Sequence, residues 1–315
     1  MVYLMNKPLI SIILPTYNVG KYMERCLTSC LNQSFDNFEI IIIDDCGVDN
    51  SIEVANKYSE KDERIKIISN KENMGTYQAR KKGALHAIGD YILYLDPDDE
   101  LKSGALKIIS LQVMKNPELD LLLFNTEYVP KLKFWNMKPK VPVGVFKKNI
   151  VNKILKTKNI PYGTMGKLYS KSALIESFQF LSIPNSVRLV YGEDVLVFAS
   201  VLLNVRIAKG IADEIYVYHL NDTSITNQDS HTSLLNHIEQ LELVIRYLGI
   251  LKSHPNYIST FEYFSKKIEI DKLFMEIKTV KTNKENIEVM LKILSITSCW
   301  RTSAKSIVAV LRKKY

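Results

Sequence analysis

The stretch YILYLDPDDE, residues 91–100, is an apolar run that ends on three carboxylates. Asp96, Asp98 and Asp99 fill three of four consecutive positions, and like charges that close disfavour each other's ionisation. Asp and Pro are also common turn residues, so an ordinary strand-to-helix turn is the alternative interpretation. The sequence on either side of this stretch is needed to choose between a simple turn and a functional site.

Short apolar runs alternate with helical periodicity over the first 125 residues. Runs of strand length occur at 9–17, 38–45, 65–69, 91–96 and 119–125, and apolar residues at three-and-four spacing predict helices between them. The run FEIIIIDD at 38–45 is rich in β-branched residues, which is typical of a parallel strand covered on both faces. This alternation predicts an α/β fold with a mostly parallel sheet.

The alternation of strand-length apolar runs with helical periodicity ends after residue 125. A lysine-rich, loop-like stretch begins near 128, a mixed region continues to about 228, and helical periodicity dominates the remainder. We therefore expect one α/β domain over 1–228, made of halves at 1–125 and 126–228. A helical, basic region at 229–315 is expected to follow it as an appendage.

Positive charge is unevenly distributed along the chain, whose net charge is +8. Residues 128–175 contain eleven lysines and no Asp or Glu, and residues 265–315 contain twelve Lys or Arg against five acids. Such surfaces attract nucleic acid, anionic lipid or phosphorylated substrates. A solvated basic face without a partner is the alternative. No apolar run approaches the roughly 18 to 20 residues that span a bilayer.

Acidic residues follow two of the predicted strands. Asp44 and Asp45 end the second strand, the three aspartates of 96–99 end the fourth, and PTYN at 15–18 ends the first. Because the carboxyl ends of parallel strands meet at one edge, where open α/β sheets bind ligands, we expect these residues to share a site.

The kind of ligand can be narrowed by the motifs that are missing. The first strand is not followed by G-x-G-x-x-G, and the chain has no G-x-x-x-x-G-K-[ST]. A diphosphate can be bound without such loops through Mg²⁺ or Mn²⁺, which one or two carboxylates hold together with substrate phosphates and water. A bound cation would also neutralise the crowded aspartates.

Five motifs in order resemble those of the family 2 glycosyltransferases, which have the GT-A nucleotide-sugar-binding fold. They are ISIILPTYN (10–18), FEIIIIDDCGVDNS (38–51), NMGTYQARKKGA (73–84), GDYILYLDPDD (89–99) and YGEDVLVF (191–198). The resemblance covers roughly the first 220 residues. It is closest to bacterial galactosyltransferases and related enzymes that build lipooligosaccharide outer cores. On this basis 1–125 is the nucleotide-binding half, and 126–228 is the acceptor-binding half.

The resemblance also implies roles for individual residues. The nucleotide-sugar site would consist of Pro15, Thr16, Tyr17, Asp44, Asp45, Arg80, Asp96, Asp98, Lys167 and His219. Tyr17 would stack on the nucleobase, Asp45 would hydrogen-bond its edge, and Asp44 would support the strand end. Asp96 would contact the ribose, and Asp98, with Asp96, would hold the metal ion.

The remaining assignments concern the acceptor side. Asp194 would be the base that takes the proton of the acceptor hydroxyl, and Glu193 would position the acceptor. The alternatives are structural: Glu193 and Asp194 could simply begin a helix, where acids suit the helix dipole. Likewise Lys167 and His219 could be structural, Tyr17 a core ring and Asp99 a helix N-cap.

The expected function is therefore an inverting, metal-dependent transfer of a hexose, galactose as best guess, from a UDP-sugar to a saccharide or glycolipid acceptor. Mn²⁺ or Mg²⁺ is the expected cofactor, and no nucleic acid is expected as a partner. The basic tail CWRTSAKSIVAVLRKKY, residues 299–315, predicts peripheral attachment to the inner face of an anionic cytoplasmic membrane.

Two alternative functions are left open. One is a nucleotidyltransferase that makes sugar nucleotides, although PTYNVGKY (15–22) contains only one Gly and one Lys for binding a triphosphate. The other is a non-enzymatic polyanion-binding protein, which the basic charge and the aromatic residues interleaved in 128–175 would suit.

Overall fold

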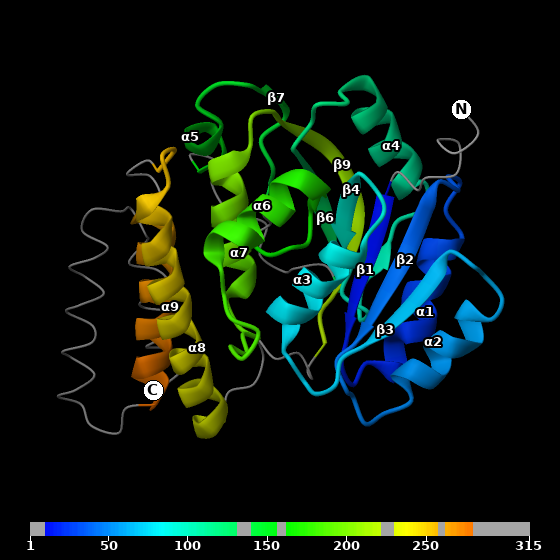
Figure 1. Ribbon diagram of the computed structural model, residues 1–315, viewed down its shortest axis with the longest axis horizontal. Helices are drawn as coiled ribbons and strands as arrows, with labels where there is room; N and C mark the ends of the chain where they lie inside the picture. Colours follow the sequence, from blue (N-terminus) through cyan, green and yellow to red (C-terminus); the bar gives the residue numbers. More distant parts are fainter. Residues whose placement is uncertain (1–9, 131–139, 156–161, 222–229, 258–261, 280–315) are drawn as a thin grey trace.

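A computed structural model describes residues 10–130, 140–155, 162–221, 230–257 and 262–279 (Figure 1). The strands are β1 (Ile10–Thr16), β2 (Phe38–Asp44), β3 (Ile65–Ser69), β4 (Tyr91–Tyr94), β5 (Glu100–Leu101), β6 (Leu121–Val129), β7 (Gly144–Phe146), β8 (Lys167–Ser170) and β9 (Ala208–His219). The helices are α1 (Gly20–Leu31), α2 (Ser51–Ser59), α3 (Thr76–His86), α4 (Ala105–Lys115), α5 (Ile150–Leu155), α6 (Lys171–Leu181), α7 (Glu193–Asn204), α8 (His231–Ile250) and α9 (Glu262–Thr279).

Within these described residues the strands form one sheet in the order β3-β2-β1-β4-β8-β6-β9-β5, and β7 pairs with β9. Strands β1 to β4 pair in parallel, as the alternating pattern predicts. The α/β fold is therefore confirmed. Beyond β4 the sheet is mixed, because β8 pairs antiparallel with both β4 and β6.

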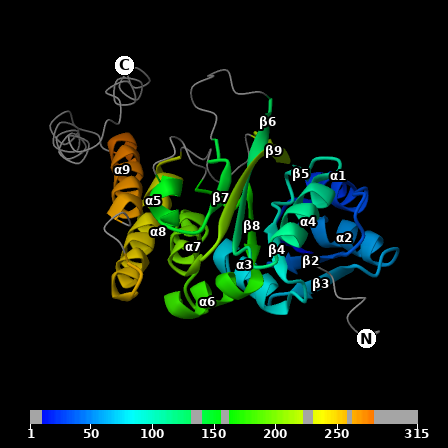
Figure 2. The same cartoon turned by 90° about the horizontal axis from the view of Figure 1, so that it is seen from above.

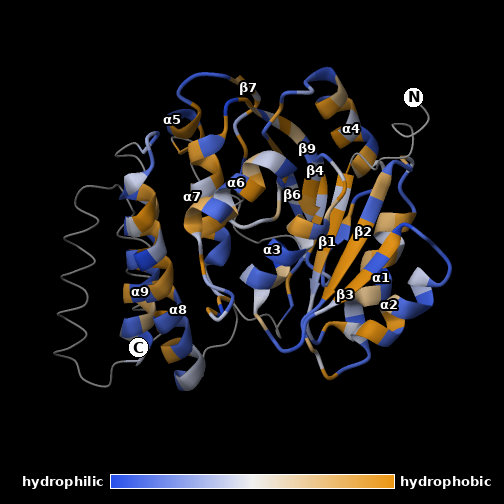
Figure 3. Ribbon diagram, in the orientation of Figure 1, coloured by the Kyte–Doolittle hydropathy of each residue, from blue (hydrophilic) through white to orange (hydrophobic). Residues whose placement is uncertain are grey.

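Both faces of the sheet are covered, which explains the nearly continuous apolar character of β1 and β2 (orange in Figure 3). Alternate residues point to opposite faces. Ile12 and its neighbours Ile40 and Leu93 belong to the core shared with α1, α2 and α4. Ile13 and Ile41 belong to the core shared with α3, α6 and α7. Figure 2 shows these two groups of helices on opposite sides of the sheet.

Among the described residues, helices α8 and α9 lie on the far side of α7 from the sheet (Figure 1). Leu241, Val244 and Phe264 are fully buried or nearly so, in the same core as α7. The division at residue 228 stays a prediction, but the described helices beyond it share their core with the α/β region. The predicted membrane-binding tail lies outside the described residues.

No helix among the described residues has both the length and the apolar character required to cross a membrane.

A close approach between α3 and β1 generates a testable prediction. A Cβ added to Gly83 would lie 2.4 Å from Cγ2 of Ile13, a branch of a stiff, fully buried side chain. We expect Gly83→Ala to lower the free energy of unfolding by about 1–3 kcal/mol, as overpacked core positions do. Urea denaturation measures this change.

The matched control is Gly249→Ala in α8. A Cβ at Gly249 would meet nothing within 4 Å, and the position is exposed. We expect this variant to be more stable by about 0.5–1 kcal/mol, because Ala loses less conformational entropy in a helix. Equal effects of the two substitutions would contradict the close α3–β1 packing.

Candidate active site

The carboxyl ends of β1, β2 and β4 lie side by side, because these strands are parallel neighbours. A cavity of about 690 Å³ lies at this edge. Its lining includes, of the residues predicted from the sequence, Pro15, Tyr17, Asp45, Arg80, Asp96, Asp98, Glu193 and Asp194. The strand ends thus meet at one edge of the sheet, as expected, and the start of α7 lines the same cavity, while the roles of these residues stay predictions.

The aspartate turn after β4 is held by residues of the distant strand β9 and the segment after it. The Tyr216 hydroxyl donates to Oδ2 of Asp99 at 2.6 Å and accepts from the backbone N–H of Asp96 at 3.2 Å. The backbone N–H of His219 donates to Oδ1 of Asp99 at 2.8 Å. Nδ2 of Asn221 donates to Oδ2 of Asp98 at 2.6 Å.

Tyr216 and Asn221 were not found from the sequence, and no local signal there could have found them. Their importance depends on the pairing of β9 with β5 and β6, which brings residues about 120 positions apart into contact. Periodicity reports which residues face a core, but it does not report which strands become neighbours.

The electrostatics of the turn reflect crowding of negative charge. Burial, and then the neighbouring Asp96, raise the pKa of Asp98, although Asn221 favours its ionised form. Burial, and then Asp98 and Asp96, raise the pKa of Asp99 to about 8. Asp99 is fully buried and does not line the cavity. Asp96 and Asp98 are therefore the carboxylates of the turn that a ligand can reach.

Arg80 of α3 bridges the two sides of the cavity. Its Nη2 donates to Oδ1 of Asp96 at 2.8 Å, and its Nη1 donates to Oε1 of Glu193 at 2.7 Å. Its guanidinium also lies 5.8 Å from the ring centroid of Tyr94. Burial opposes the charge of Arg80, but Asp96 and Glu193 outweigh it and raise the pKa. Arg80 is therefore a buried cation between two carboxylates rather than a surface cation.

Residues after β1 and β2 form the other end of the cavity. The Tyr17 ring is 46% exposed at the cavity wall, so it is not a core ring. Oδ1 of Asp45 accepts from Nδ2 of Asn70 at 2.7 Å, and Oδ2 accepts from the backbone N–H of Gly75 at 2.9 Å. These bonds fix the turn that precedes α3. Asp44 and Thr16 do not line the cavity.

The adjacent acids at the start of α7 differ in their surroundings. Glu193 is buried and bound to Arg80; burial raises its pKa to about 7, although Arg80 favours the ionised form. Oδ1 of Asp194 accepts from the backbone N–H of Val195 at 2.7 Å. Its Oδ2 makes no hydrogen bond to any of the described residues and lies beside Gly163. Of the two, Asp194 is thus the acid that is available in the cavity.

Two further predicted site residues, Lys167 and His219, do not line the cavity. The Lys167 ammonium is fully buried, where it donates to the carbonyl oxygens of Gly163 and Met165 and lies 4.5 Å from the ring centroid of Phe198. It therefore fastens the segment that lines the cavity. The His219 ring lies 2.6 Å from Oε1 of Glu100 and does not line the cavity. Direct contact of either side chain with substrate stays a prediction.

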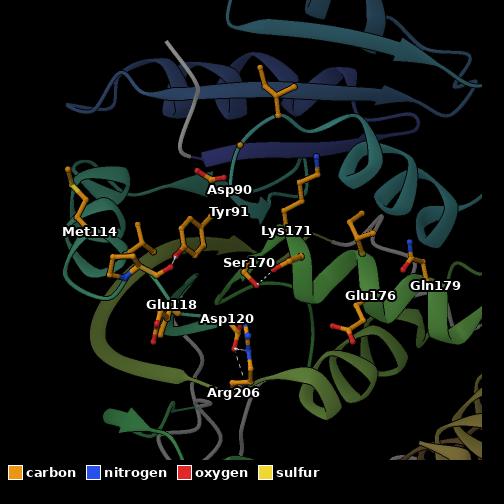
Figure 4. Close-up of a pocket in the computed structure, with 17 residues that line it drawn as sticks. Asp90, Tyr91, Met114, Glu118, Asp120, Ser170, Lys171, Glu176, Gln179 and Arg206 are labelled. Carbon is orange, nitrogen blue, oxygen red and sulfur yellow. Dashed lines mark hydrogen bonds and ion pairs between the residues drawn. The ribbon is translucent and has the colours of Figure 1, made fainter. Parts of the chain in front are cut away.

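A larger cavity, about 970 Å³, lies at the opposite edge of the sheet, by the start of β4 and the end of β8 (Figure 4). Several of its polar groups bond to one another or to the backbone. Nη2 of Arg206 lies 3.2 Å from Oδ1 of Asp120, and the Tyr91 hydroxyl donates to the Pro117 carbonyl at 3.0 Å. The smaller cavity is the candidate active site, because it gathers the acids that were predicted from the sequence to form a site.

The α/β sheet, the carboxylates after β4 and the acid at the start of α7 define a GT-A-type transferase fold. Residues 11–178, more than half of the chain, match the family Glycosyl transferase family 2. The chain belongs to this glycosyltransferase family. Membership favours the transferase over both alternatives considered from the sequence, the nucleotidyltransferase and the polyanion-binding protein.

Two curated relatives match the N-terminal part of the chain. An uncharacterized glycosyltransferase of Haemophilus influenzae is 47% identical over 103 residues, which is 33% of this chain and 41% of the relative. TuaG of Bacillus subtilis, named for teichuronic acid biosynthesis, is 41% identical over 101 residues, or 32% of this chain and 40% of the relative. The chain thus spans about two fifths of the length of these relatives.

Solved structures show the same fold over most of the chain. Residues 1–349 of TarS from S. aureus, in complex with UDP-GlcNAc, align with a TM-score of 0.64 and 20% identity, covering 91% of this chain and 81% of TarS 1–349. The mannosyltransferase PcManGT from Pyrobaculum calidifontis, in complex with GDP-Man and Mn²⁺, aligns with a TM-score of 0.57 and 12% identity, covering 98% and 81%.

The buried ammonium of Lys167 generates a prediction on pH. Burial lowers the pKa of Lys167 to about 7, against about 10.4 in an unfolded chain. Between these values the unfolded chain binds more protons, so the stability of the native protein rises with pH. Relative to Lys167→Met, the free energy of unfolding should rise by up to about 1.4 kcal/mol per pH unit from pH 7 to 10.

Urea denaturation at pH 7, 8, 9 and 10 measures this difference. Lys147→Met is the control, because Lys147 is exposed and keeps its ammonium in water. A difference between the native protein and Lys167→Met that stays constant over this range would show that the ammonium is not buried.

Proposed function

We propose that the chain is an inverting, metal-dependent glycosyltransferase. It transfers a hexose, galactose as the best guess, from a UDP-sugar to a saccharide of a bacterial surface glycan such as lipooligosaccharide. The observation that carries this proposal is that acids from two separate segments line one cavity. They are Asp96 and Asp98 after β4, and Asp194 at the start of α7. The UDP-GlcNAc bound by TarS supports the donor class, and the name of TuaG supports the acceptor class.

The residues after β4 fit a divalent cation. Burial and the neighbouring Asp96 raise the pKa of Asp98. The protein by itself therefore does not fully stabilise the ionised form of this carboxylate, and a cation would do so. No group of three His, Cys, Asp or Glu side chains that could hold a metal ion occurs within the described part of the chain. Asp96 and Asp98 both line the cavity, and two carboxylates are enough for Mg²⁺ or Mn²⁺ if substrate phosphates and water supply the remaining ligands. The cation would neutralise the departing diphosphate.

The acceptor side requires a base. In direct displacement the acceptor oxygen bonds to the anomeric carbon, the bond from that carbon to the diphosphate oxygen breaks, and UDP leaves with the electron pair. Asp194 takes the proton of the acceptor hydroxyl, because it lines the cavity and its Oδ2 accepts no hydrogen bond from the described residues. Glu193 holds Arg80 instead, and so positions the wall of the site.

The donor side uses the residues after β1 and β2. The exposed ring of Tyr17 is placed to stack on the nucleobase, and Asp45 lines the same end of the cavity. Peripheral attachment of the tail to an anionic membrane remains part of the proposal, and it would bring the site to a lipid-linked acceptor.

The first test is a donor panel that measures nucleotide release from several sugar nucleotides in the presence of Mn²⁺. We expect turnover with UDP-galactose and loss of turnover in excess EDTA. Asp98→Ala should lower turnover at least about 100-fold, the scale of losing a principal electrostatic contact with the transition state. Asp213→Ala, at an exposed position of β9, is the control. Full turnover in EDTA would refute the metal requirement.

The second test separates the adjacent acids of α7. Asp194→Asn should keep UDP binding within a few-fold while lowering transfer by roughly 10²–10⁴-fold, as expected for loss of a general base. Glu193→Gln should instead lower the thermal stability, because it weakens the partner of a buried cation. Normal transfer by Asp194→Asn with an inactive Glu193→Gln would reverse the two roles. Activity of both variants would refute the assignment.

A further inference from the structure

The C-terminal helices form one wall of the candidate active site. Leu241 of α8 and Ile268 and Asp271 of α9 line the same cavity as Asp98 and Asp194. These residues lie beyond 11–178, the part that matches the family. The wall is therefore supplied by a region that the family match does not describe.

This wall is packed directly against the segment that carries Asp194. A Cβ on Gly192 would lie 3.0 Å from Cδ2 of Leu241. The backbone N–H of Val190 donates to Oε1 of Gln240 at 2.9 Å. The Tyr191 ring stacks on His237, with centroids 4.2 Å apart and an interplanar angle of 17°. The positions of α8 and of the proposed base are therefore coupled.

Asp271 has no evident structural reason to be acidic. Lys267, one turn earlier in α9, donates to Oδ1 of Asp271 at 2.9 Å and to Oδ2 at 3.1 Å, and the two side chains are 38% and 39% exposed. Such partly exposed pairs contribute little to stability, and the order Lys then Asp along a helix is the less favourable one. Asp271 also lines the cavity. A carboxylate is thus presented to whatever enters the cavity from this side.

The chemistry of this wall fits a sugar. Tyr191 also lines the cavity, and an aromatic ring packs against the apolar C–H face of a pyranose, whereas a carboxylate accepts hydrogen bonds from its hydroxyls. Two arginines, Arg80 and Arg188, also line the cavity. Arg80 is held between Asp96 and Glu193, and Arg188 donates to Asn73 at 2.8 Å. The lining as a whole carries a net negative charge, because two arginines face six acids: Asp45, Asp96, Asp98, Glu193, Asp194 and Asp271.

We propose that Asp271 and Tyr191 form the acceptor subsite, and that Asp271 selects an uncharged sugar. Asp271 accepts hydrogen bonds from hydroxyls of the acceptor other than the one that attacks, and it repels acceptors that carry a carboxylate or phosphate. This inference rests on the proposed function, because it places an acceptor beside Asp194. Through Asp271, helix α9 would thus help to determine which acceptor is used.

The test uses p-nitrophenyl glycosides as acceptors. Neutral β-glucoside, β-galactoside and β-N-acetylglucosaminide are compared with the β-glucuronide, which differs from the glucoside by a carboxylate at C6. Binding in the presence of UDP and Mn²⁺ is followed by saturation-transfer NMR, and kinetics are measured with the donor identified in the panel. The intact chain should bind at least one neutral glycoside and discriminate against the glucuronide.

Asp271→Asn should raise the KM for the neutral acceptor about 10-fold, the scale of one lost hydrogen bond to a charged group. The same variant should show a smaller preference for the neutral glycoside over the glucuronide. Its KM for the donor should be unchanged. Lys267→Gln is the matched control, since it breaks the same ion pair but keeps the carboxylate. It should leave the acceptor KM within about two-fold, and thermal melting checks the fold of both variants.

Three outcomes would overturn this inference: no neutral glycoside binds the intact chain, Asp271→Asn leaves the acceptor KM and the preference unchanged, or Lys267→Gln reproduces the effects of Asp271→Asn. Donor hydrolysis without acceptor is measured in the same samples. If hydrolysis persists, the proposed transferase stands and only the subsite is refuted. If the intact chain hydrolyses no sugar nucleotide, the proposed function itself fails.

Discussion

The ion pairs of Arg80 connect the parts of the active site. Asp96 follows β4 in the parallel region, Glu193 begins α7, and Arg80 reaches both from α3. Removing a cation from water costs several kcal/mol, and here two carboxylates compensate that cost. Loss of either acid would leave buried charge unbalanced. The turn that carries Asp98 and the helix start that carries Asp194 are therefore held in a defined relation to each other.

The same turn shows how a protein tolerates adjacent aspartates. Tyr216 and the backbone of His219 donate to Asp99, which is fully buried, and Asn221 donates to Asp98. These bonds offset part of the repulsion among the acids, and the raised pKa values show that the rest remains. Residual negative charge at the edge of a cavity is the property that a cation-binding site needs. Strand β9 thus stabilises the aspartate turn, although it does not supply most of the cavity lining.

The helices beyond residue 228 have a different relation to the site from the one expected. They were predicted to be an appendage, but Leu241 and Ile268 line the cavity and belong to the core shared with α7. Their docking against the segment 190–192 links the acceptor side of the cavity to α7. A region that the family match does not cover is well suited to distinguish acceptors among proteins that share one donor-binding half.

The sequence by itself determined the parallel strands β1 to β4, the two covered faces of the sheet and the meeting of Asp45, Asp96 and Asp98 at one edge. Each of these follows from local periodicity and from the geometry of βαβ units. Only the tertiary structure decided that Arg80 is a buried bridge, that Lys167 is buried away from the cavity, and that Asp271 lines it. Those outcomes depend on contacts between residues far apart in the chain, for which the local pattern of side chains carries no signal.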